Sequence, residues 1–435
     1  MRSFAPARVF SALILLSLAP GSGAQPRRTK PEPEKAPVEK PRARALGITF
    51  GGQPGPFNAI TDVAGVEVGH TTLISGEGRL TVGEGPVRTG VTAVLPLGRE
   101  HVAGSVFAAT YALNGNGEMT GTLWVGESGQ LAGPIMLTNT NSVGTVRDAV
   151  VAWGARRNLS WELALPVVAE TYDGFLNDID GFHVKPEHAV GALESARGAA
   201  PVAEGNVGGG TGMMCHGFKG GIGTASRKLP ESQGGYTLGV LVQCNYGSRR
   251  LLSVEGVPVG EEIPDLQACY VGTEAPRSRF SRNMRPCGSS ASLTPPLQPE
   301  GMGSIIVLVA TDAPLLPHQL ARIARRVPLG IGKMGGLGED SSGDLFLAFS
   351  TQPISPPDGS PVARVGSLDN ERLNPLFEAT VQATQESILN AMLAAETLTG
   401  ADGIRVHALP RERLVRALRK YGRLSSPAPE GSTGK

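Results

Sequence analysis

Residues 301–314 have the sequence Gly-Met-Gly-Ser-Ile-Ile-Val-Leu-Val-Ala-Thr-Asp-Ala-Pro. After the small residues Gly303 and Ser304, the run of apolar and β-branched residues predicts a buried strand. A serine therefore occupies the first position of a core strand, directly after a glycine that lets another backbone approach closely. This junction is the most informative feature of the chain.

The junction has two interpretations. If the peptide bond before Ser304 is cut, the new chain begins with a serine that carries both a hydroxyl and a free α-amine. An α-amine has an ordinary pKa of about 7.7–8.0 and can act as general base for the hydroxyl, as in N-terminal nucleophile catalysis. The local sequence alone favours the simpler interpretation, in which Gly303 and Ser304 merely begin a strand.

The first residues have the pattern of a secretory signal. Arg2 and Arg8 supply positive charge, residues 9–18 are apolar, and Ser22-Gly23-Ala24 fits a small-residue cleavage site. The apolar run is too short to span a bilayer as a helix. We therefore expect removal of residues 1–24 and a periplasmic or secreted protein without membrane association.

Composition divides the remaining chain. Residues 25–45 are rich in Pro, Lys, Arg and Glu and predict a disordered linker, and residues 425–435 predict a disordered tail. We expect residues 46–424 to form a single catalytic domain. The net charge is +1 and no basic stripe carries interleaved aromatic residues, so a nucleic-acid partner is not predicted.

Four cysteines do not make a disulfide scaffold in a chain of this length. Cys269 and Cys287 both lie in the irregular segment 264–299, where an oxidising compartment would allow a disulfide, and the sequence leaves that pairing open. Cys215 and Cys244 are expected to be buried thiols. There is no CxxC or HExxH motif and the seven histidines are scattered, so neither a metal nor another cofactor is predicted.

Strands and helices alternate along the chain, which predicts a layered α/β protein. We expect strands at 60–70, 90–97, 104–112, 122–125, 134–138, 165–170, 236–243, 304–310 and 344–351, and helices at 145–156, 315–327, 371–396 and 411–421. Residues 330–335 satisfy G-x-G-x-x-G, but a helix precedes them and a loop follows, so a dinucleotide site is not predicted. The glycines of 208–212 are expected to permit close backbone packing.

Polar residues gather at the ends of predicted strands, where rigid elements position functional loops. Asn245 ends one strand, and its amide can donate to a developing oxyanion. Glu170 and Tyr172 end another strand, and the hydroxyl of Ser342 and the carboxylate of Asp344 flank a third. Taken singly, each is more typical of a cap or a turn, and spacing alone does not show that they converge.

A set of motifs in one order carries a resemblance to a known family. The motifs are residues 60–72, Thr138-Asn139-Thr140-Asn141-Ser142-Val143-Gly144, Glu170-Thr171-Tyr172-Asp173-Gly174, Gly208-Gly209-Gly210-Thr211-Gly212-Met213, Val242-Gln243-Cys244-Asn245-Tyr246-Gly247, residues 303–317 and residues 342–351. The chain resembles the peptidase family that contains the self-processing L-aminopeptidase/D-esterase-amidase and the β-peptidyl aminopeptidases.

This resemblance implies a fold and an activity. The fold would be α/β, a four-layer αββα sandwich that resembles N-terminal nucleophile hydrolases but has different connectivity. The chain would cut itself between Gly303 and Ser304 into α and β chains and assemble as a homotetramer of α/β pairs. Its substrates would be peptides or aminoacyl amides or esters, and no cofactor is implied.

The resemblance also implies roles for particular residues. Ser304 matches the nucleophile, Asn245 the oxyanion-stabilising asparagine, Ser342 and Asp344 a hydroxyl–carboxylate pair beside the nucleophile, Tyr172 a tyrosine near the tetrahedral centre, and Glu170 a carboxylate suited to the ammonium of the substrate.

Three points stay open. Residues 267–299 are an insertion relative to compact members of the family, and we favour a surface position over one that covers the site. The preference among L-, D- and β-aminoacyl substrates is not determined. The alternative functions are an acetyltransferase of the ornithine acetyltransferase type, which uses a threonine where this chain has Ser304, and an unprocessed periplasmic binding protein.

Overall fold

The computed structural model describes residues 41–159, 162–277, 281, 284–289, 303–354, 362 and 365–424. The expected signal, residues 25–40 of the expected linker and the expected tail lie outside the described residues. The expected linker boundary at residue 45 is wrong, because Ala43–Leu46 forms a 3₁₀ helix with Ala43 fully buried. The Arg44 guanidinium also bonds to the buried carboxylate of Glu386, so the folded domain includes these residues.

Two stacked sheets form the centre of the domain. One has five strands in the order β6-β5-β2-β1-β7, and the other has six in the order β10-β11-β13-β14-β3-β4. The bounds in the first sheet are β1 (Glu67–Ser75), β2 (Val87–Leu95), β5 (Ile135–Asn139), β6 (Val167–Thr171) and β7 (Arg197–Gly198). Those in the second are β3 (Ser105–Ala112), β4 (Gln130–Ala132), β10 (Gly221–Lys228), β11 (Thr237–Asn245), β13 (Gly303–Thr311) and β14 (Ser342–Ser350).

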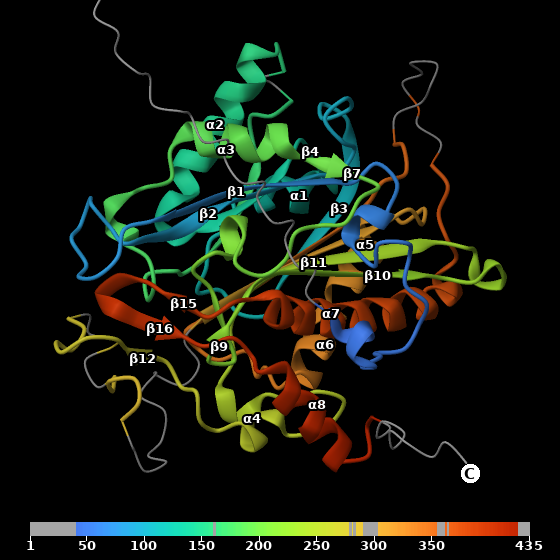
Figure 1. The fold of residues 1–435 in the computed structure, drawn as a ribbon. Helices are drawn as coiled ribbons and strands as arrows, with labels where there is room; N and C mark the ends of the chain where they lie inside the picture. The colour runs from blue at the N-terminus through green and yellow to red at the C-terminus, as the bar shows by residue number, and fades with distance from the viewer. Residues whose placement is uncertain are drawn as a thin grey trace, which may run out of the picture. The chain divides into compact units, whose positions relative to one another are not determined.

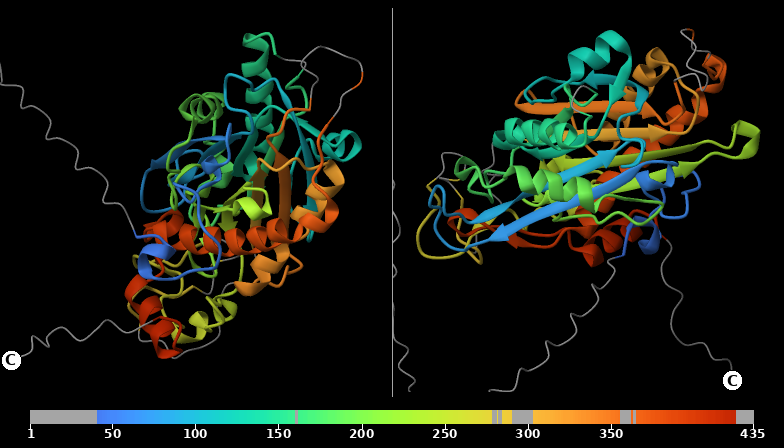
Figure 2. Two further views of the ribbon diagram at one scale, coloured as in Figure 1. Left: turned by 90° about the vertical axis from the view of Figure 1, so that its right-hand side faces the viewer. Right: turned by 90° about the horizontal axis from the view of Figure 1, so that it is seen from above.

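Helices cover the outer face of each sheet. The helices α2 (Val143–Arg156) and α3 (Pro186–Ser195) pack on the five-stranded sheet, and α5 (Pro317–Ala324), α6 (Val327–Lys333) and α7 (Asn374–Ala394) lie on the side of the six-stranded sheet. Figures 1 and 2 show α2 and α3 on one side of the sheets and α7 on the other. Buried apolar residues such as Val94, Leu137 and Ile306 fill the space between the sheets. The expected four-layer αββα sandwich is confirmed.

Smaller elements complete the described part of the chain. They are α1 (Thr122–Ser128), α4 (Val259–Glu262), α8 (Arg411–Lys420), β8 (Met214–Cys215), β9 (Phe218–Lys219), β12 (Cys269–Tyr270), β15 (Leu398–Thr399) and β16 (Ile404–Val406). In the described residues, no helix combines the length and the apolar character needed to cross a bilayer.

Most expected elements are present, but two strands were expected wrongly. Residues 122–125 belong to helix α1, although their apolar composition favours a strand. Gly121 and Gly129 both adopt left-handed backbone conformations and delimit this helix. Residues 60–62 form a 3₁₀ turn in which the Asp62 carboxylate accepts bonds from nearby backbone N–H groups, so the first strand begins only at Glu67.

The glycine-rich segment 208–212 packs as expected. A Cβ at Gly209 would lie 2.8 Å from the carbonyl oxygen of Leu137, and one at Gly210 would lie 2.4 Å from the nitrogen of Ile222. Both obstacles are backbone atoms, which cannot rotate away, so no larger residue fits. This close packing seats the hairpin β8–β9 against the end of β11.

The structure contains two disulfides. Cys269 is bonded to Cys287, which was one of the open possibilities, and Cys215 is bonded to Cys244. The expectation that Cys215 and Cys244 are free thiols is therefore wrong. Their Cα atoms are 5.6 Å apart, within the usual range for a disulfide, because β8 lies beside the end of β11.

The described part of the insertion 267–299 lies partly in the protein interior. Its strand β12 pairs with β16, and Tyr270 and Met284 are buried. They share an apolar cluster with Leu176 and Met214. The surface position that we favoured is therefore wrong for these residues, whose apolar side chains are excluded from water by this cluster.

We predict that the unreduced, denatured protein has no free thiol and that reduction releases four. A thiol-reactive dye with mass spectrometry measures both numbers. The double variant Cys269→Ser/Cys287→Ser should still give none before reduction, because Cys215 and Cys244 pair independently. Two reactive thiols in that variant would contradict the Cys215–Cys244 bond.

Candidate active site

Strand register brings three residues together at one end of the central strands of the six-stranded sheet. The central strand β13 runs antiparallel to β11 and parallel to β14. The amino ends of β13 and β14 therefore lie beside the carboxyl end of β11. Ser304 is opposite Asn245 on one side and Gly343 on the other. Neighbouring strands are about 4.8 Å apart, so these residues are in direct contact range.

Gly303 is required by its surroundings. Its φ of +136° lies in the region that favours glycine. A Cβ there would lie 2.0 Å from the carbonyl oxygen of Asn245. The Gly303–Ser304 junction is thus held tightly against the backbone of the residue that was expected to stabilise an oxyanion.

The Ser304 hydroxyl is buried and accepts a bond from the backbone N–H of Gly343 at 3.1 Å. Ser342 and Asp344 form the expected pair: the Ser342 hydroxyl donates to Asp344 Oδ1 at 2.5 Å. The backbone N–H of Ile305 donates to the same oxygen at 3.3 Å. The pair is therefore beside the main chain of β13.

Side-chain alternation determines what this pair can reach. The side chains of Ile306 and Leu345 face the space between the sheets, whereas those of Ile305 and Phe346 face the helices. By the same alternation, the side chain of Ser304 faces the space between the sheets, and those of Ser342 and Asp344 face the helical side. The pair thus lies on the opposite face of the strands from the Ser304 hydroxyl, and its hydrogen bond to β13 is with the backbone N–H of Ile305, the residue after Ser304. Burial raises the pKa of Asp344, while the bond from Ser342 lowers it.

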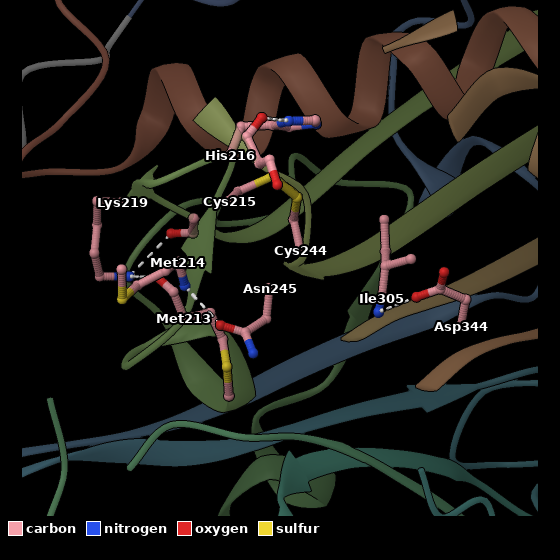
Figure 3. The surroundings of a disulfide bond; sticks show 11 residues. Met213, Met214, Cys215, His216, Lys219, Cys244, Asn245, Ile305 and Asp344 are labelled. Carbon is pink, nitrogen blue, oxygen red and sulfur yellow. Dashed lines mark hydrogen bonds between the residues drawn. A yellow bond between two sulfur atoms is a disulfide. The ribbon is translucent and has the colours of Figure 1, made fainter. Parts of the chain in front are cut away.

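The Asn245 amide is held at both ends. Its Oδ1 accepts a bond from the N–H of Met214 at 2.8 Å (Figure 3). Its Nδ2 donates to the carbonyl oxygen of Tyr172 at 3.0 Å. A backbone N–H needs an acceptor and a carbonyl needs a donor, so the orientation of the amide is determined. These two bonds also fix the direction of the second N–H of Asn245, which can donate to an oxyanion at Ser304.

Glu170 lies at the end of β6 and is nearly fully buried. Its Oε1 accepts from the N–H of Glu118 at 2.9 Å, and its Oε2 accepts from the Thr140 hydroxyl. Burial raises its pKa, and both bonds lower it. A Cβ at Gly117 would lie 3.3 Å from Glu170 Oε1 and 3.1 Å from the Cα of Gly343, so this loop lies between Glu170 and the Ser304 strand edge.

Tyr172 joins the site through its backbone. Its carbonyl oxygen accepts from Asn245, whereas its ring packs edge-on against Phe175 with centroids 6.1 Å apart. A Cβ at Gly174 would lie 2.4 Å from its hydroxyl oxygen, so the phenol folds back over its own turn. The structure thus brings together Ser304, Asn245, Ser342 and Asp344, with Glu170 behind the 114–118 loop.

Sequence reasoning missed three supporting groups: Asn114, Thr140 and the Met214 N–H. Asn114 Oδ1 accepts from the N–H of Asp344 at 2.6 Å, and Thr140 bonds to Glu170. The run Asn114-Gly115-Asn116-Gly117 begins two residues after the end of strand β3 and was a detectable polar segment at a strand end, of the same kind as Asn245. A backbone donor such as Met214 leaves no sequence signal.

In the described ranges, no group of three or more His, Cys, Asp or Glu side chains could hold a metal ion.

Comparison with known proteins finds close relatives. The family model described as peptidase family S58 matches residues 58–406. The chain is 53% identical over 394 residues to the β-peptidyl aminopeptidase BapA of Sphingosinicella microcystinivorans, an alignment that covers 90% of this chain and 95% of that protein.

Solved structures are also similar. A β-aminopeptidase of Burkholderia sp. matches with a TM-score of 0.73 and 45% identity over 88% of this chain and 99% of that one. The L-aminopeptidase D-Ala-esterase/amidase of Ochrobactrum anthropi matches with a TM-score of 0.75 and 43% identity over 89% of this chain and 100% of that one. The latter is described as a prototype for the serine aminopeptidases and as a variant of the Ntn hydrolase fold.

We predict that Asp344→Asn lowers the hydrolysis of aminoacyl p-nitroanilides by about 10²-fold, because Ser342 loses the charged acceptor of its proton. In the unaltered protein the carboxylate is lost as the pH falls through the pKa of Asp344, which burial raises. Activity should therefore decline on the acid side at a higher pH than an ordinary aspartate would give.

The matched control is Asp340→Asn, which removes an exposed carboxylate from the loop before β14. Initial rates across a pH series measure both variants. Equal activity of the two variants would contradict a role for Asp344.

Proposed function

The chain belongs to peptidase family S58 and is a hydrolase of the aminopeptidase type, and from this membership we propose that it is a self-processing enzyme with Ser304 as N-terminal nucleophile. The observation that carries the proposal is the position of Ser304. It begins the central buried strand, follows a glycine pressed against Asn245, and lies opposite that asparagine. No other described serine combines these features with a neighbouring hydroxyl–carboxylate pair.

In the proposed processing reaction, Ser304 Oγ attacks the carbonyl carbon of Gly303. The C–N bond breaks, the hydroxyl proton passes to the departing nitrogen, and an ester and a free α-amine result. Water then hydrolyses the ester, which gives the Gly303 carboxylate and restores the Ser304 hydroxyl. Ser342 and Asp344 come from the strand beside Ser304, and Asp344 accepts from the N–H of the next residue, Ile305, which supports a role for the pair near the nitrogen that gains the proton.

In the proposed hydrolysis, the α-amine of Ser304 accepts the proton of its own hydroxyl while the oxygen attacks the substrate amide. Asn245 donates to the oxyanion, a contribution typically of about 10²–10³ in rate. The protonated amine returns the proton to the leaving group, and water releases the acyl group. Ser342 and Asp344, which are hydrogen-bonded to each other, stabilise the positive charge of the protonated amine.

We propose that the substrates are peptides or aminoacyl amides with a free ammonium, with β-aminoacyl compounds preferred. Glu170 supports the first point, since a buried carboxylate is stabilised by a bound cation. The β preference rests on the relative that is 53% identical, a β-peptidyl aminopeptidase.

Export and assembly are further parts of the proposal. The N-terminal pattern and two disulfides in one domain are typical of a protein that matures in an oxidising compartment, here the periplasm or the exterior. A homotetramer of α/β pairs rests on the family resemblance, and sedimentation would measure it.

We predict that Ser304→Ala yields one uncleaved chain and no hydrolysis. The unaltered protein should give two bands on a denaturing gel, of which the smaller begins Ser-Ile-Ile-Val. Edman sequencing of both bands checks this, and a larger band that begins at Gln25 would support export. Two-chain processing of Ser304→Ala would rule out the proposed nucleophile.

We predict that Glu170→Gln lowers kcat/KM for aminoacyl p-nitroanilides by about 10–100-fold, mainly through KM, because a neutral amide binds an ammonium less well than a carboxylate does. Glu127→Gln, which removes an exposed carboxylate from helix α1, is the matched control. The measurement is a panel of L-, D- and β-aminoacyl p-nitroanilides. Unchanged KM in Glu170→Gln would contradict the ammonium site, and faster L than β hydrolysis would contradict the β preference.

A further inference from the structure

A buried lysine lies next to the proposed oxyanion site. Lys219, in strand β9, is fully buried, and its ammonium donates to the carbonyl oxygens of Met213 at 2.7 Å, Gly220 at 3.0 Å and Gly210 at 3.4 Å. Burial of a charge is costly unless it is compensated. These carbonyl groups provide part of that compensation, and Lys219 has no part in the proposed reaction.

The carbonyl group of Met213 is connected to Asn245 through a single peptide group. It belongs to the same peptide group as the N–H of Met214, which donates to Asn245 Oδ1 at 2.8 Å. Figure 3 shows Lys219, this peptide and Asn245 in one row, with Ile305 and Asp344 beyond them. The hydrogen bonds therefore run without interruption from the Lys219 ammonium, through one peptide, to the side-chain amide of Asn245.

Each hydrogen bond in this series strengthens the next one. An amide is conjugated, so a cation at its oxygen draws electron density from its nitrogen and makes its N–H a better donor. The Met213–Met214 peptide is polarised in this way by Lys219, and it polarises the Asn245 amide in turn. The free N–H of Asn245 is the final donor of the series.

We propose that Lys219 is a positioning residue that orients and polarises Asn245 through the Met213–Met214 peptide. The inference rests on the proposed function, since the Asn245 N–H is the group that would meet the oxyanion. The ammonium of Lys219 bonds to backbone carbonyl groups, and its effect on the reaction would be exerted through Asn245.

The surrounding hairpin holds this row in register. The Cys215–Cys244 disulfide joins the residue after Met214 to the residue before Asn245. The N–H of His216, the residue after Cys215, donates to the carbonyl oxygen of Tyr246, the residue after Asn245, at 2.7 Å. The disulfide and this hydrogen bond hold the two segments together, and they therefore limit how far the Met214 N–H can move from Asn245 Oδ1.

Asp173 provides the opposite charge. Burial lowers the pKa of Lys219 to about 7, and attraction to Asp173 opposes that decrease. Asp173 is itself buried, and Asn177 donates to its carboxylate at 3.0 Å. Burial also raises the pKa of Asp173 to about 7. The carbonyl dipoles therefore compensate the ammonium throughout, and Asp173 does so where it is ionised.

The test is a double-mutant cycle in the full-length protein with Lys219→Met and Asn245→Ala. Kinetics on a β-aminoacyl p-nitroanilide are normalised to the processed chain seen on a gel. We expect Lys219→Met to lower kcat about tenfold, a fraction of the effect of a whole oxyanion donor, with KM changed less than about twofold. In the Asn245→Ala background it should lower kcat less than about twofold.

The matched control is Arg249→Met. Arg249 is another buried cation that donates to carbonyl oxygens of the same hairpin, those of His216 and Gly217, but it has no bond to the Met213–Met214 peptide. Its removal should lower Tm, and any effect on kcat should be the same in both Asn245 backgrounds. A Lys219→Met effect that is also the same in both backgrounds would overturn the proposal.

A second measurement does not depend on activity or processing. In uncleaved Ser304→Ala protein, the proton chemical shifts of the Asn245 side-chain amide report its polarisation. Lys219→Met and the neutral donor variant Lys219→Gln should move these signals upfield, and Arg249→Met should not. Unmoved signals overturn the inference, whereas absence of hydrolysis by the unaltered protein would overturn the proposed function instead.

Discussion

The site depends on the close approach of Gly303 to the backbone of Asn245. This contact places the start of β13 against the end of β11, and no residue with a side chain could occupy the position. Because β13 is central, its register determines the positions of its neighbours on both sides: Asn245 across one ladder, Gly343 across the other. Main-chain pairing thus determines which residues meet at the site, and side-chain hydrogen bonds determine how their functional groups are oriented.

The site also depends on both faces of the six-stranded sheet, which carry different groups. The Ser304 hydroxyl faces the five-stranded sheet, where Asn245 and the end of β6 supply polar groups. The carboxylate of Asp344 is on the helical side and acts at the backbone of β13.

Much of this could be predicted from the sequence. The apolar runs located β11, β13 and β14, and the polar residues at their ends offered Asn245, Ser342 and Asp344 as candidates, to which only the family resemblance gave roles. Residues 122–125 were misassigned because apolar composition over four residues does not distinguish a strand from a helix. The pairing of Cys215 with Cys244 and the bond from Met214 to Asn245 could not be predicted, because they depend on how a glycine-rich turn packs across two sheets. Lys219 gave no signal, since a lone lysine is ordinarily a surface residue.

One feature of the six-stranded sheet bears on the lifetime of the enzyme. Apart from Gly303 itself, strands β13 and β14 follow the Gly303–Ser304 bond, and they are flanked on both sides by strands that precede it. All four cysteines also precede it, so no disulfide connects the two segments. Once the proposed cut is made, two separate polypeptides share one interleaved sheet, and the loss of either exposes strand edges on the other. Unfolding would then release fragments that must find each other again, so the mature protein would persist because its unfolding is slow rather than because its folding is reversible.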